Sequence, residues 1–167
     1  MNTKENIALI GMPAAGKTTI GHLLSKKIGF KFLDSDDVIQ EKEQQTLAQI
    51  IDSKGLDTFL EIEEHHVTGI DCKGYVIATG GSVVYSKKAM NHLSSFCTIV
   101  YLSMELSGLL TRLCDLTSRG VAITPGKSIE DLYKERTPLY DRYCDIKIDC
   151  CTMTIDQVIE TAVKSLS

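Results

Sequence analysis

Short apolar runs alternate with longer segments of helical periodicity along the whole chain. The apolar runs predict strands at residues 7–10, 30–33, 75–78, 98–102 and 146–148. The intervening segments predict helices at 18–28, 87–93, 106–116, 129–143 and 154–166, with further helical patterns through residue 70. Apolar strands separated by helices are typical of a parallel sheet that is covered on both faces. The pattern therefore predicts an α/β fold.

One long connection interrupts this alternation, from Thr117 to Lys127, with the sequence TSRGVAITPGK. Its glycines and Pro125 predict a mobile loop, and Arg119 gives that loop a positive charge. A loop of this length in a compact domain is more often functional than idle. We therefore expect the segment to contribute to function.

The length and composition predict a single globular domain over residues 1–167. The chain is 43% hydrophobic and 24% charged, and it contains no run of about 18 apolar residues that could span a membrane. Its N-terminus lacks the basic and long apolar regions of a signal peptide. We expect a cytoplasmic, monomeric protein without a membrane partner.

Charge and cysteine content argue against two further classes of function. The net charge is −4 and the basic residues are scattered, so no basic stripe is available to bind a nucleic acid. The six cysteines form no C-x-x-C pair, which predicts reduced thiols. The pair His65-His66 lies far in sequence from any pair of cysteines, so no structural zinc site is expected.

The strongest motif is Gly11-Met12-Pro13-Ala14-Ala15-Gly16-Lys17-Thr18, which matches G-x-x-x-x-G-K-[ST]. It lies between a predicted strand and a predicted helix. Glycines there let backbone N–H groups converge on phosphate oxygens, and the start of the helix adds a positive dipole end. The lysine of the motif is expected to reach the β and γ phosphates, and its threonine to offer a hydroxyl to Mg²⁺. The alternative is a glycine-rich turn before a structural helix.

The motifs that GTPases use to bind guanine nucleotides are not found in this sequence in their usual places. The chain contains no N-K-x-D motif, which a GTPase would use to read guanine. Residues 71–74 match D-x-x-G, but they precede an apolar run instead of following one, which favours a simple turn. The sequence thus argues against a GTPase.

A cluster of carboxylates, Asp34-Ser35-Asp36-Asp37, follows the predicted strand at 30–33, which we expect beside the strand of the phosphate-binding motif. Open α/β sheets bind ligands at this end of their strands. In an extended segment Asp34 and Asp36 project to the same side, so one could serve Mg²⁺ and the other could meet the hydroxyl that is phosphorylated. The alternative is an N-cap, with Asp36 or Asp37 capping a helix that begins at Val38.

A third motif, Gly80-Gly81-Ser82, directly follows the predicted strand at 75–78. Adjacent glycines let backbone amides approach a ligand closely. A simple turn between a strand and a helix is the alternative.

Taken in order, the segments GMPAAGKTT, FLDSD, IATGGS, the arginine-bearing loop and ERTPLY resemble the shikimate kinase family across essentially the whole chain. The resemblance implies a three-layer P-loop kinase fold, with a five-stranded parallel sheet flanked by helices and a lid at about residues 117–127. It also implies the cofactors ATP and Mg²⁺. The implied reaction transfers the γ-phosphoryl group to a hydroxyl of a small molecule, converting shikimate to shikimate 3-phosphate.

The resemblance assigns the donor side of the reaction residue by residue. Lys17 and Arg119 resemble the pair that clamps the phosphates, and Arg112 resembles the arginine that contacts adenine. Thr18 and Asp34 resemble the partners of Mg²⁺. The remaining nucleotide-binding positions are Gly11, Ala14, Ala15, Gly16 and Thr19.

On the acceptor side, Asp36 resembles the carboxylate that takes or orients the proton of the reacting hydroxyl. Gly80 and Gly81 resemble the family's acceptor-binding glycines, and Arg136 resembles an arginine that binds the shikimate carboxylate. A helix-surface ion pair with neighbouring carboxylates is the alternative for this arginine.

Three departures from the family pattern concern the acceptor side and the lid. Phe59-Leu60 stands where the family has Phe-Arg, Ser82 replaces a third glycine, and Gly120 replaces a proline after the lid arginine. A lost charge-assisted hydrogen bond is worth roughly 1.5 to 3 kcal/mol, enough to weaken carboxylate binding tenfold or more. A kinase for another small hydroxy acid or polyol, or a nucleotide-binding regulatory protein, therefore remains an alternative.

Overall fold

The computed structural model describes residues 4–114 and 127–166. Nearly all of the loop expected at 117–127, including Arg119, lies outside these ranges. The remaining elements form the predicted α/β architecture.

Five parallel strands form the central sheet, in the order β2-β3-β1-β4-β5. They are β1 (Asn6–Ile10), β2 (Lys31–Asp34), β3 (Tyr75–Ala78), β4 (Cys97–Ser103) and β5 (Ile146–Asp149). Each predicted strand is confirmed, with ends that differ by one residue at most. The expectation that β2 lies beside β1 is wrong, because β3 pairs with both and separates them.

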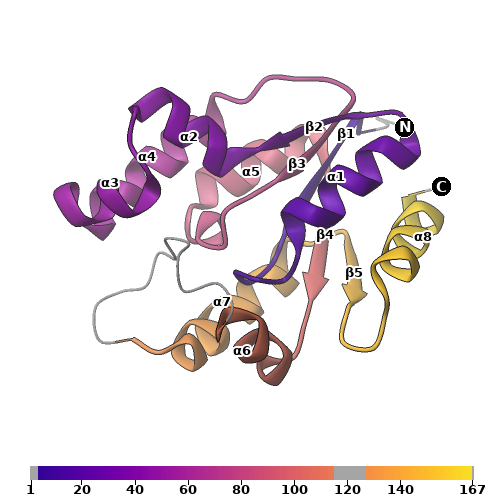
Figure 1. Ribbon diagram of the computed structural model, residues 1–167. Helices are drawn as coiled ribbons and strands as arrows, with labels where there is room; N and C mark the ends of the chain where they lie inside the picture. The colour runs from indigo at the N-terminus through magenta and orange to yellow at the C-terminus, as the bar shows by residue number, and fades with distance from the viewer. Residues whose placement is uncertain (1–3, 115–126, 167) are drawn as a thin grey trace.

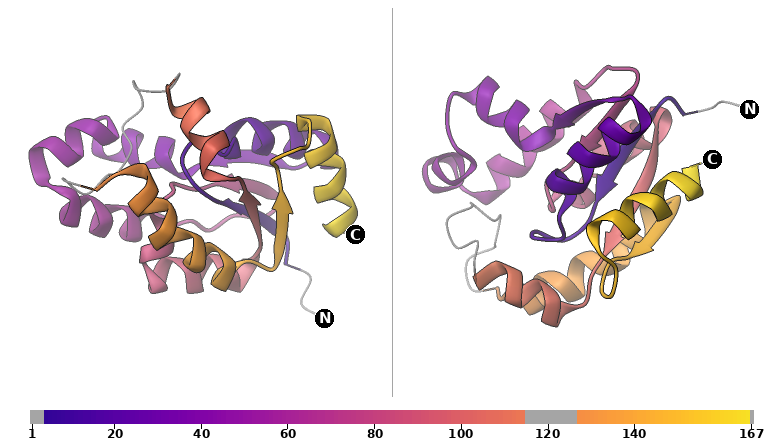
Figure 2. Two further views of the ribbon diagram at one scale, coloured as in Figure 1. Left: turned by 90° about the horizontal axis from the view of Figure 1, so that it is seen from below. Right: turned by 45° about the vertical axis from the view of Figure 1, so that its right-hand side comes forward.

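Eight helices and one 3₁₀ turn connect and cover these strands in the described part of the chain. They are α1 (Lys17–Ile28), α2 (Ser35–Glu43), α3 (Leu47–Lys54), α4 (Leu56–Thr68), η1 (Val83–Tyr85), α5 (Lys87–Phe96), α6 (Leu106–Cys114), α7 (Ile129–Tyr143) and α8 (Ile155–Leu166). Helices α1 and α8 lie on one face of the sheet, and α5 and α7 lie on the other (Figures 1 and 2). None of these described helices is long and apolar enough to cross a membrane.

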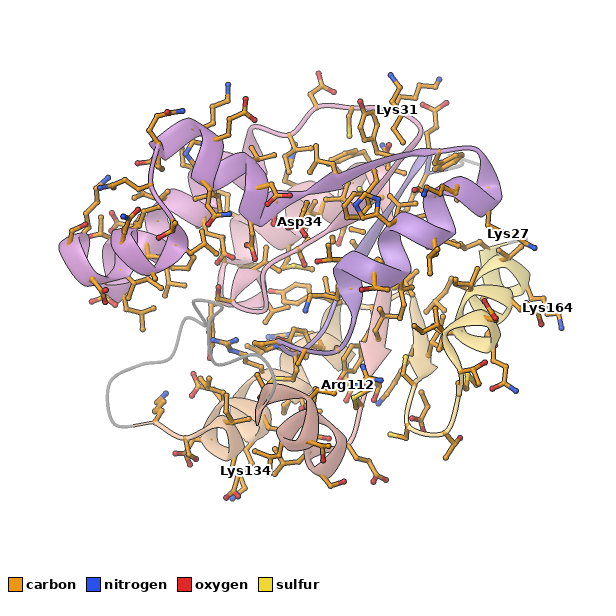
Figure 3. All side chains as sticks on the ribbon, viewed as in Figure 1. Lys27, Lys31, Asp34, Arg112, Lys134 and Lys164 are labelled. Carbon is orange, nitrogen blue, oxygen red and sulfur yellow. The ribbon has the colours of Figure 1, made fainter. Side chains whose placement is uncertain are left out.

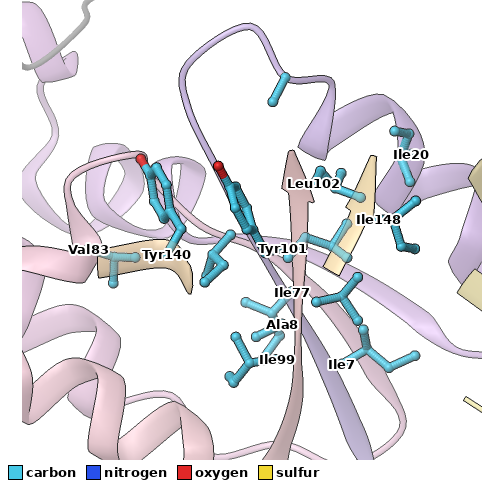
Figure 4. Packing of buried hydrophobic residues seen from close by; sticks show 14 of the residues in the cluster. Ile7, Ala8, Ile20, Ile77, Val83, Ile99, Tyr101, Leu102, Tyr140 and Ile148 are labelled. Atoms are coloured by element: carbon cyan, nitrogen blue, oxygen red, sulfur yellow. The ribbon is translucent and has the colours of Figure 1, made fainter. Parts of the chain in front are cut away.

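The main core forms between the sheet and these helices. All residues of β1 are buried because the strand is central and covered on both faces. Ile7 and Ala8 of β1 pack with Ile77 of β3 and Ile99 of β4 (Figure 4). Removal of this apolar surface from water is the main favourable term in folding. Because the five strands of this core are parallel, their carboxyl ends lie at the same edge of the sheet.

A second, smaller apolar cluster joins α2, α3 and α4 at the β2 side of the sheet. Ile39, Ile50 and Phe59 are its buried residues, and Leu60 packs against them. Helix α4 also packs against α5, which connects this cluster to the main body of the fold. The cluster thereby sets the position of α2 and α4 relative to the sheet edge.

The transition from β2 to α2 differs from the expectation. Helix α2 begins at Ser35, not at Val38, and the N-cap is Asp34, whose Oδ1 accepts a hydrogen bond from the backbone N–H of Asp36 at 3.0 Å. The interpretation of Asp36 or Asp37 as the cap is therefore wrong. A cap at the last strand residue turns the chain at once, because its side chain satisfies a free N–H of the first helical turn.

Candidate active site

The loop Gly11–Thr18 connects β1 to α1, as the motif predicts. A Cβ on Gly11 would lie 2.7 Å from the carbonyl oxygen of Leu102, so the backbone there requires glycine. Gly16 forms the N-cap of α1 with φ +93°, and Ala14 has φ +67°, a left-handed conformation that costs energy outside glycine. The loop thus holds a backbone conformation that few sequences tolerate, next to the start of a helix.

Lys17 is buried at the first position of α1. Its Nζ donates hydrogen bonds to the carbonyl oxygens of Gly11 and Met12, both at 2.8 Å. Burial lowers the pKa of this ammonium to about 8, and the nearby carboxylates of Asp36 and Asp34 oppose that shift. The charge therefore lies directly over the loop.

Thr18 and Asp34 meet beside this lysine. The Thr18 hydroxyl donates a hydrogen bond to Oδ2 of Asp34 at 2.8 Å. Figure 3 shows Asp34 where β2 gives way to α2, opposite the start of α1. Hydroxyl and carboxylate oxygens are hard ligands that suit Mg²⁺, which usually takes one or two protein ligands and completes its shell with phosphates and water. The pair fits such an ion, and the described residues contain no group of three or more His, Cys, Asp or Glu that could hold a metal.

Asp36 lies in the first turn of α2, so the extended geometry predicted for the two carboxylates is wrong. The carboxylates of Asp34 and Asp36 remain neighbours. Oδ1 of Asp36 is buried and has no hydrogen-bond partner among the described residues. Burial raises the pKa of Asp36 to about 6, Asp34 adds to this shift, and Lys17 opposes it. Asp37, in contrast, is exposed.

Gly80 is in contact with two carboxylates. A Cβ at this position would lie 2.5 Å from Oε1 of Glu63 and 2.9 Å from Oδ1 of Asp36. Its backbone N–H donates to the hydroxyl of Ser35 at 3.2 Å. Any larger residue here would displace one or both of these carboxylates, so glycine lets them lie this close to the backbone.

Arg136 lies at the neighbouring glycine. A Cβ on Gly81 would be 3.0 Å from Nη1 of Arg136, which is 1% exposed. Its Nε donates to the hydroxyl of Tyr85 at 3.0 Å, and its guanidinium lies 5.1 Å from the centre of that ring. The alternative of a surface ion pair is wrong for this buried cation. Arg136 instead places positive charge beside the Gly80-Gly81 backbone.

Tyr140 supports this arrangement and was missed by the sequence analysis. Its hydroxyl donates to the carbonyl oxygen of Gly81 at 2.7 Å, and its ring lies 5.1 Å from that of Tyr101, measured between centres (Figure 4). Burial raises the pKa of Tyr140 above its ordinary value. The available signal is helical spacing, since Tyr140 lies four residues after Arg136 on the buried face of α7.

Glu63 was also missed, and it is the second buried carboxylate of the site. The buried residues of α4 are Phe59, Glu63 and Val67, so a charged residue occupies the apolar stripe of the helix. Its Oε2 accepts a hydrogen bond from the Ser82 hydroxyl at 2.8 Å. Burial raises the pKa of Glu63 to about 7; Asp36 adds to the shift, whereas Ser82 opposes it. A glutamate at i+4 from Phe59 was the signal that could have identified it.

Arg112 lies on α6 on the opposite side of the phosphate-binding loop from α2 (Figure 3). Its Nη1 donates to the carbonyl oxygen of Ala14 at 3.3 Å and would lie 3.7 Å from a Cβ on Gly16. The structure therefore brings the residues predicted for the donor side and for the acceptor side together around the phosphate-binding loop. The exception is Arg119, which lies outside the described residues.

Comparisons with known proteins agree with this arrangement. Residues 13–167 match the family model described as shikimate kinase. A shikimate kinase of Vibrio cholerae is 34% identical over 169 residues, covering 99% of this chain and 97% of that relative.

Solved structures of shikimate kinases have the same fold as this chain. The shikimate kinase from Acinetobacter baumannii in complex with shikimate superposes with a TM-score of 0.85 and 27% identity, covering 98% of this chain and 93% of that one. The shikimate kinase from Aquifex aeolicus has a TM-score of 0.80 at 29% identity, with 96% and 95% covered.

Proposed function

The chain belongs to the shikimate kinase family, and on that premise we propose that Asp36 and the buried Arg136 bind shikimate for phosphorylation at its 3-hydroxyl. The enzyme is a phosphotransferase that uses ATP and acts on an alcohol group. One observation carries the proposal for the site: a carboxylate and a guanidinium lie beside adjacent glycines at the same sheet edge as the P-loop.

On the donor side, Lys17 would bind the β and γ phosphates. Within the described residues, its ammonium donates to the carbonyl oxygens of Gly11 and Met12, and phosphate oxygens are stronger acceptors for it. Thr18 and Asp34 would hold Mg²⁺, which neutralises phosphate charge when bound. The residues Gly11 to Thr19 supply the backbone amides and the helix start for the phosphates, and Arg112 would lie against adenine.

On the acceptor side, Asp36 would accept a hydrogen bond from the reacting hydroxyl and thereby aim its oxygen at the γ phosphorus. Its Oδ1 supports this role, because this buried oxygen has no hydrogen-bond partner in the described part of the chain and a buried carboxylate oxygen requires a donor. Arg136 would pair with the shikimate carboxylate, and Gly80 and Gly81 let the ring lie close to the backbone. Transfer then proceeds by positioning and by charge stabilisation, as in other phosphoryl transfers.

Arg119 enters the proposal from the sequence alone. The resemblance implies that this arginine joins Lys17 in neutralising the phosphoryl group during transfer. We also propose that the enzyme acts as a monomer in the cytoplasm and that residues 1–167 form one domain.

A second acceptor class is favoured by one observation, since Leu60 packs against an apolar cluster where the family has an arginine. The acceptor would then be another small hydroxy acid or a polyol. A coupled assay of ADP release, with shikimate, other hydroxy acids and polyols side by side, tests both. A response to shikimate at sub-millimolar concentration is expected. ATP binding without ADP release on any acceptor would instead indicate a regulatory protein.

A further inference from the structure

The side chain of Tyr85 holds Arg136 in place through two different contacts. The guanidinium is 1% exposed, and its Nε donates a hydrogen bond to the Tyr85 hydroxyl at 3.0 Å. Its Cζ lies over the tyrosine ring, 5.1 Å from the ring centre. A cation within about 6 Å of a ring centre is attracted to the ring face, and more strongly when it is removed from water. The hydroxyl and the ring of one tyrosine thus both fix the guanidinium.

Tyr85 itself lies on a short turn with a fixed backbone. It ends η1, in which Val83 and Val84 are buried. The backbone N–H of Tyr85 donates to the carbonyl oxygen of Ser82 at 3.0 Å, and the N–H of Ser86 donates to that of Val83 at 3.1 Å. The Ser86 side chain then caps α5. The tyrosine ring is therefore attached to a backbone that is held on both sides.

The hydrogen bond to Tyr85 determines which edge of the guanidinium faces the acceptor. Nε carries a single hydrogen, and that hydrogen is donated to the tyrosine. Nη1 would lie 3.0 Å from a Cβ on Gly81. The carboxylate of an acceptor would thus be bound through the Nη atoms, beside the Gly81 backbone. Rotation of the guanidinium would break the bond to the hydroxyl and move the cation off the ring.

The Tyr85 hydroxyl is oriented from its other side by Glu135. The pKa of Glu135 lies below its ordinary value chiefly because of a hydrogen bond with Lys127; burial opposes this shift, and a hydrogen bond from Tyr85 adds to it. A hydroxyl that donates to a carboxylate is a better acceptor for the guanidinium. Lys127 also forms an ion pair with Glu135, so this neighbouring carboxylate competes less for Arg136.

We propose that Tyr85 is a positioning residue, which holds Arg136 with its Nη atoms toward the carboxylate of the acceptor. This inference rests on the proposed function. The role matters because the helix position at which the family has another arginine carries Leu60, an apolar residue that packs into the small cluster. Arg136 then binds the carboxylate without that arginine, and a cation already held in its binding orientation loses less conformational freedom on binding.

The test separates the hydroxyl of Tyr85 from its ring. Tyr85→Phe keeps the ring and removes the hydrogen bond to Nε, whereas Tyr85→Leu removes both contacts. We expect KM for shikimate to rise about 3- to 10-fold in the first variant and about 10- to 50-fold in the second. Both kcat and KM for ATP should stay within about twofold of the parent values, because Tyr85 acts on acceptor binding and not on the phosphates.

A second acceptor shows whether Tyr85 acts through Arg136. The methyl ester of shikimate has the same ring and hydroxyls but no charge for the guanidinium to bind. Tyr85→Phe should therefore change kcat/KM for the ester by less than about twofold. If the ester is not phosphorylated, its inhibition constant against shikimate gives the same comparison.

Tyr75→Phe is the matched control. Tyr75 is also partly buried and also lies beside a cation, with Nζ of Lys31 5.7 Å from the centre of its ring. It begins β3, at the amino end of the strand, whereas the site lies at the carboxyl ends. This control should leave the kinetic constants for both acceptors unchanged. Thermal unfolding reports whether each variant is folded, and Tyr85→Phe alone serves as the test if Tyr85→Leu does not fold.

The outcomes separate the inference from the proposed function. A parent enzyme without shikimate-dependent ADP release overturns the proposed function, and this inference with it. If the parent phosphorylates shikimate, the inference alone is overturned by a Tyr85→Phe variant that keeps the parental KM, that loses kcat instead, or that loses equally on shikimate and its ester. A rise in KM confined to shikimate supports it.

Discussion

The hydroxyl of Thr18 donates a hydrogen bond to Oδ2 of Asp34 at 2.8 Å, joining the start of α1 to the end of β2. The two strands that precede these residues are not neighbours, because β3 lies between them. The contact is therefore made by the helix and not by strand pairing. It brings a hydroxyl and a carboxylate to the point where the phosphate-binding loop ends.

The first prediction concerns this pair. Asp34→Asn should raise the Mg²⁺ concentration for half-maximal activity about tenfold, because an amide is a weaker ligand than a carboxylate. Asparagine also caps helices well, so α2 should stay folded. The measurement is steady-state ADP release against free Mg²⁺ at fixed ATP. Asp37→Asn, on the exposed side of the same turn, is the control, and equal Mg²⁺ dependence in both variants would contradict the assignment.

Replacing Asp36 should lower kcat and leave the affinity for ATP unchanged. Asp36→Asn should lower kcat by about 100-fold or more, since the amide cannot take a proton from the hydroxyl. The dissociation constant for ATP should stay within about threefold of the parent value, because Asp36 lies on the acceptor side. Equal losses in both quantities would contradict this role.

The pH dependence follows from the shifts at Asp36 and Lys17. Burial raises the pKa of Asp36 to about 6, so kcat/KM should fall as the pH drops through 6 and the carboxylate becomes protonated. Burial lowers the pKa of Lys17 to about 8, so kcat/KM for ATP should fall again above pH 8 as the ammonium loses its charge. A profile measured from pH 5 to 9 tests both sides, and a flat one would show that neither group titrates in the free enzyme.

A side chain at Gly80 should disturb the two carboxylates of the site. Gly80→Ala places a methyl group 2.5 Å from Oε1 of Glu63 and 2.9 Å from Oδ1 of Asp36, which forces both carboxylates to move. We expect kcat/KM for the acceptor to fall at least about tenfold, since displacing reacting groups by an ångström is costly. Gly69→Ala is the matched control, because its nearest contacts would be ordinary, at 3.5 Å. The comparison uses acceptor kinetics together with thermal unfolding.

Ionisation of Glu63 should lower the free energy of unfolding as the pH rises. Burial raises its pKa from 4.5 to about 7, so the folded protein retains a proton that the unfolded chain has lost between these values. The wild type should therefore lose up to about 3 kcal/mol of unfolding free energy relative to Glu63→Gln between pH 4 and pH 8. Urea unfolding without ligands measures this difference, with Glu61→Gln as the control. Parallel curves for parent and Glu63→Gln would contradict the shift.

Leu60 offers a gain-of-function test. Leu60→Arg restores the family's arginine three residues before Glu63, and it should lower KM for shikimate about tenfold by adding a charge-assisted hydrogen bond to the carboxylate. Leu60→Met keeps the position apolar and should leave KM unchanged. A folded arginine variant with the parental KM would show that Arg136 alone meets the carboxylate.

Much of the fold could be predicted because it depends on local pattern. Buried strands such as β1 and β3 are apolar runs, and α7 has the predicted bounds Ile129 to Tyr143. The position of β2 in the sheet could not be predicted, because strands that follow one another in the sequence need not be neighbours in a sheet. The start of α2 was also misplaced, since one capping bond from Asp34 outweighed the pattern that begins at Val38.

By itself, the sequence determined the phosphate-binding loop, the acidic residues at the end of β2 and the start of α2, and the arginine of α7. Each belongs to a short motif whose chemistry depends on a few consecutive residues. Only the tertiary structure decided that Glu63 and Asp36 converge on Gly80, and that Ser82 anchors the first of them. These residues lie on separate elements, and their distances depend on how α2 and α4 pack against the sheet.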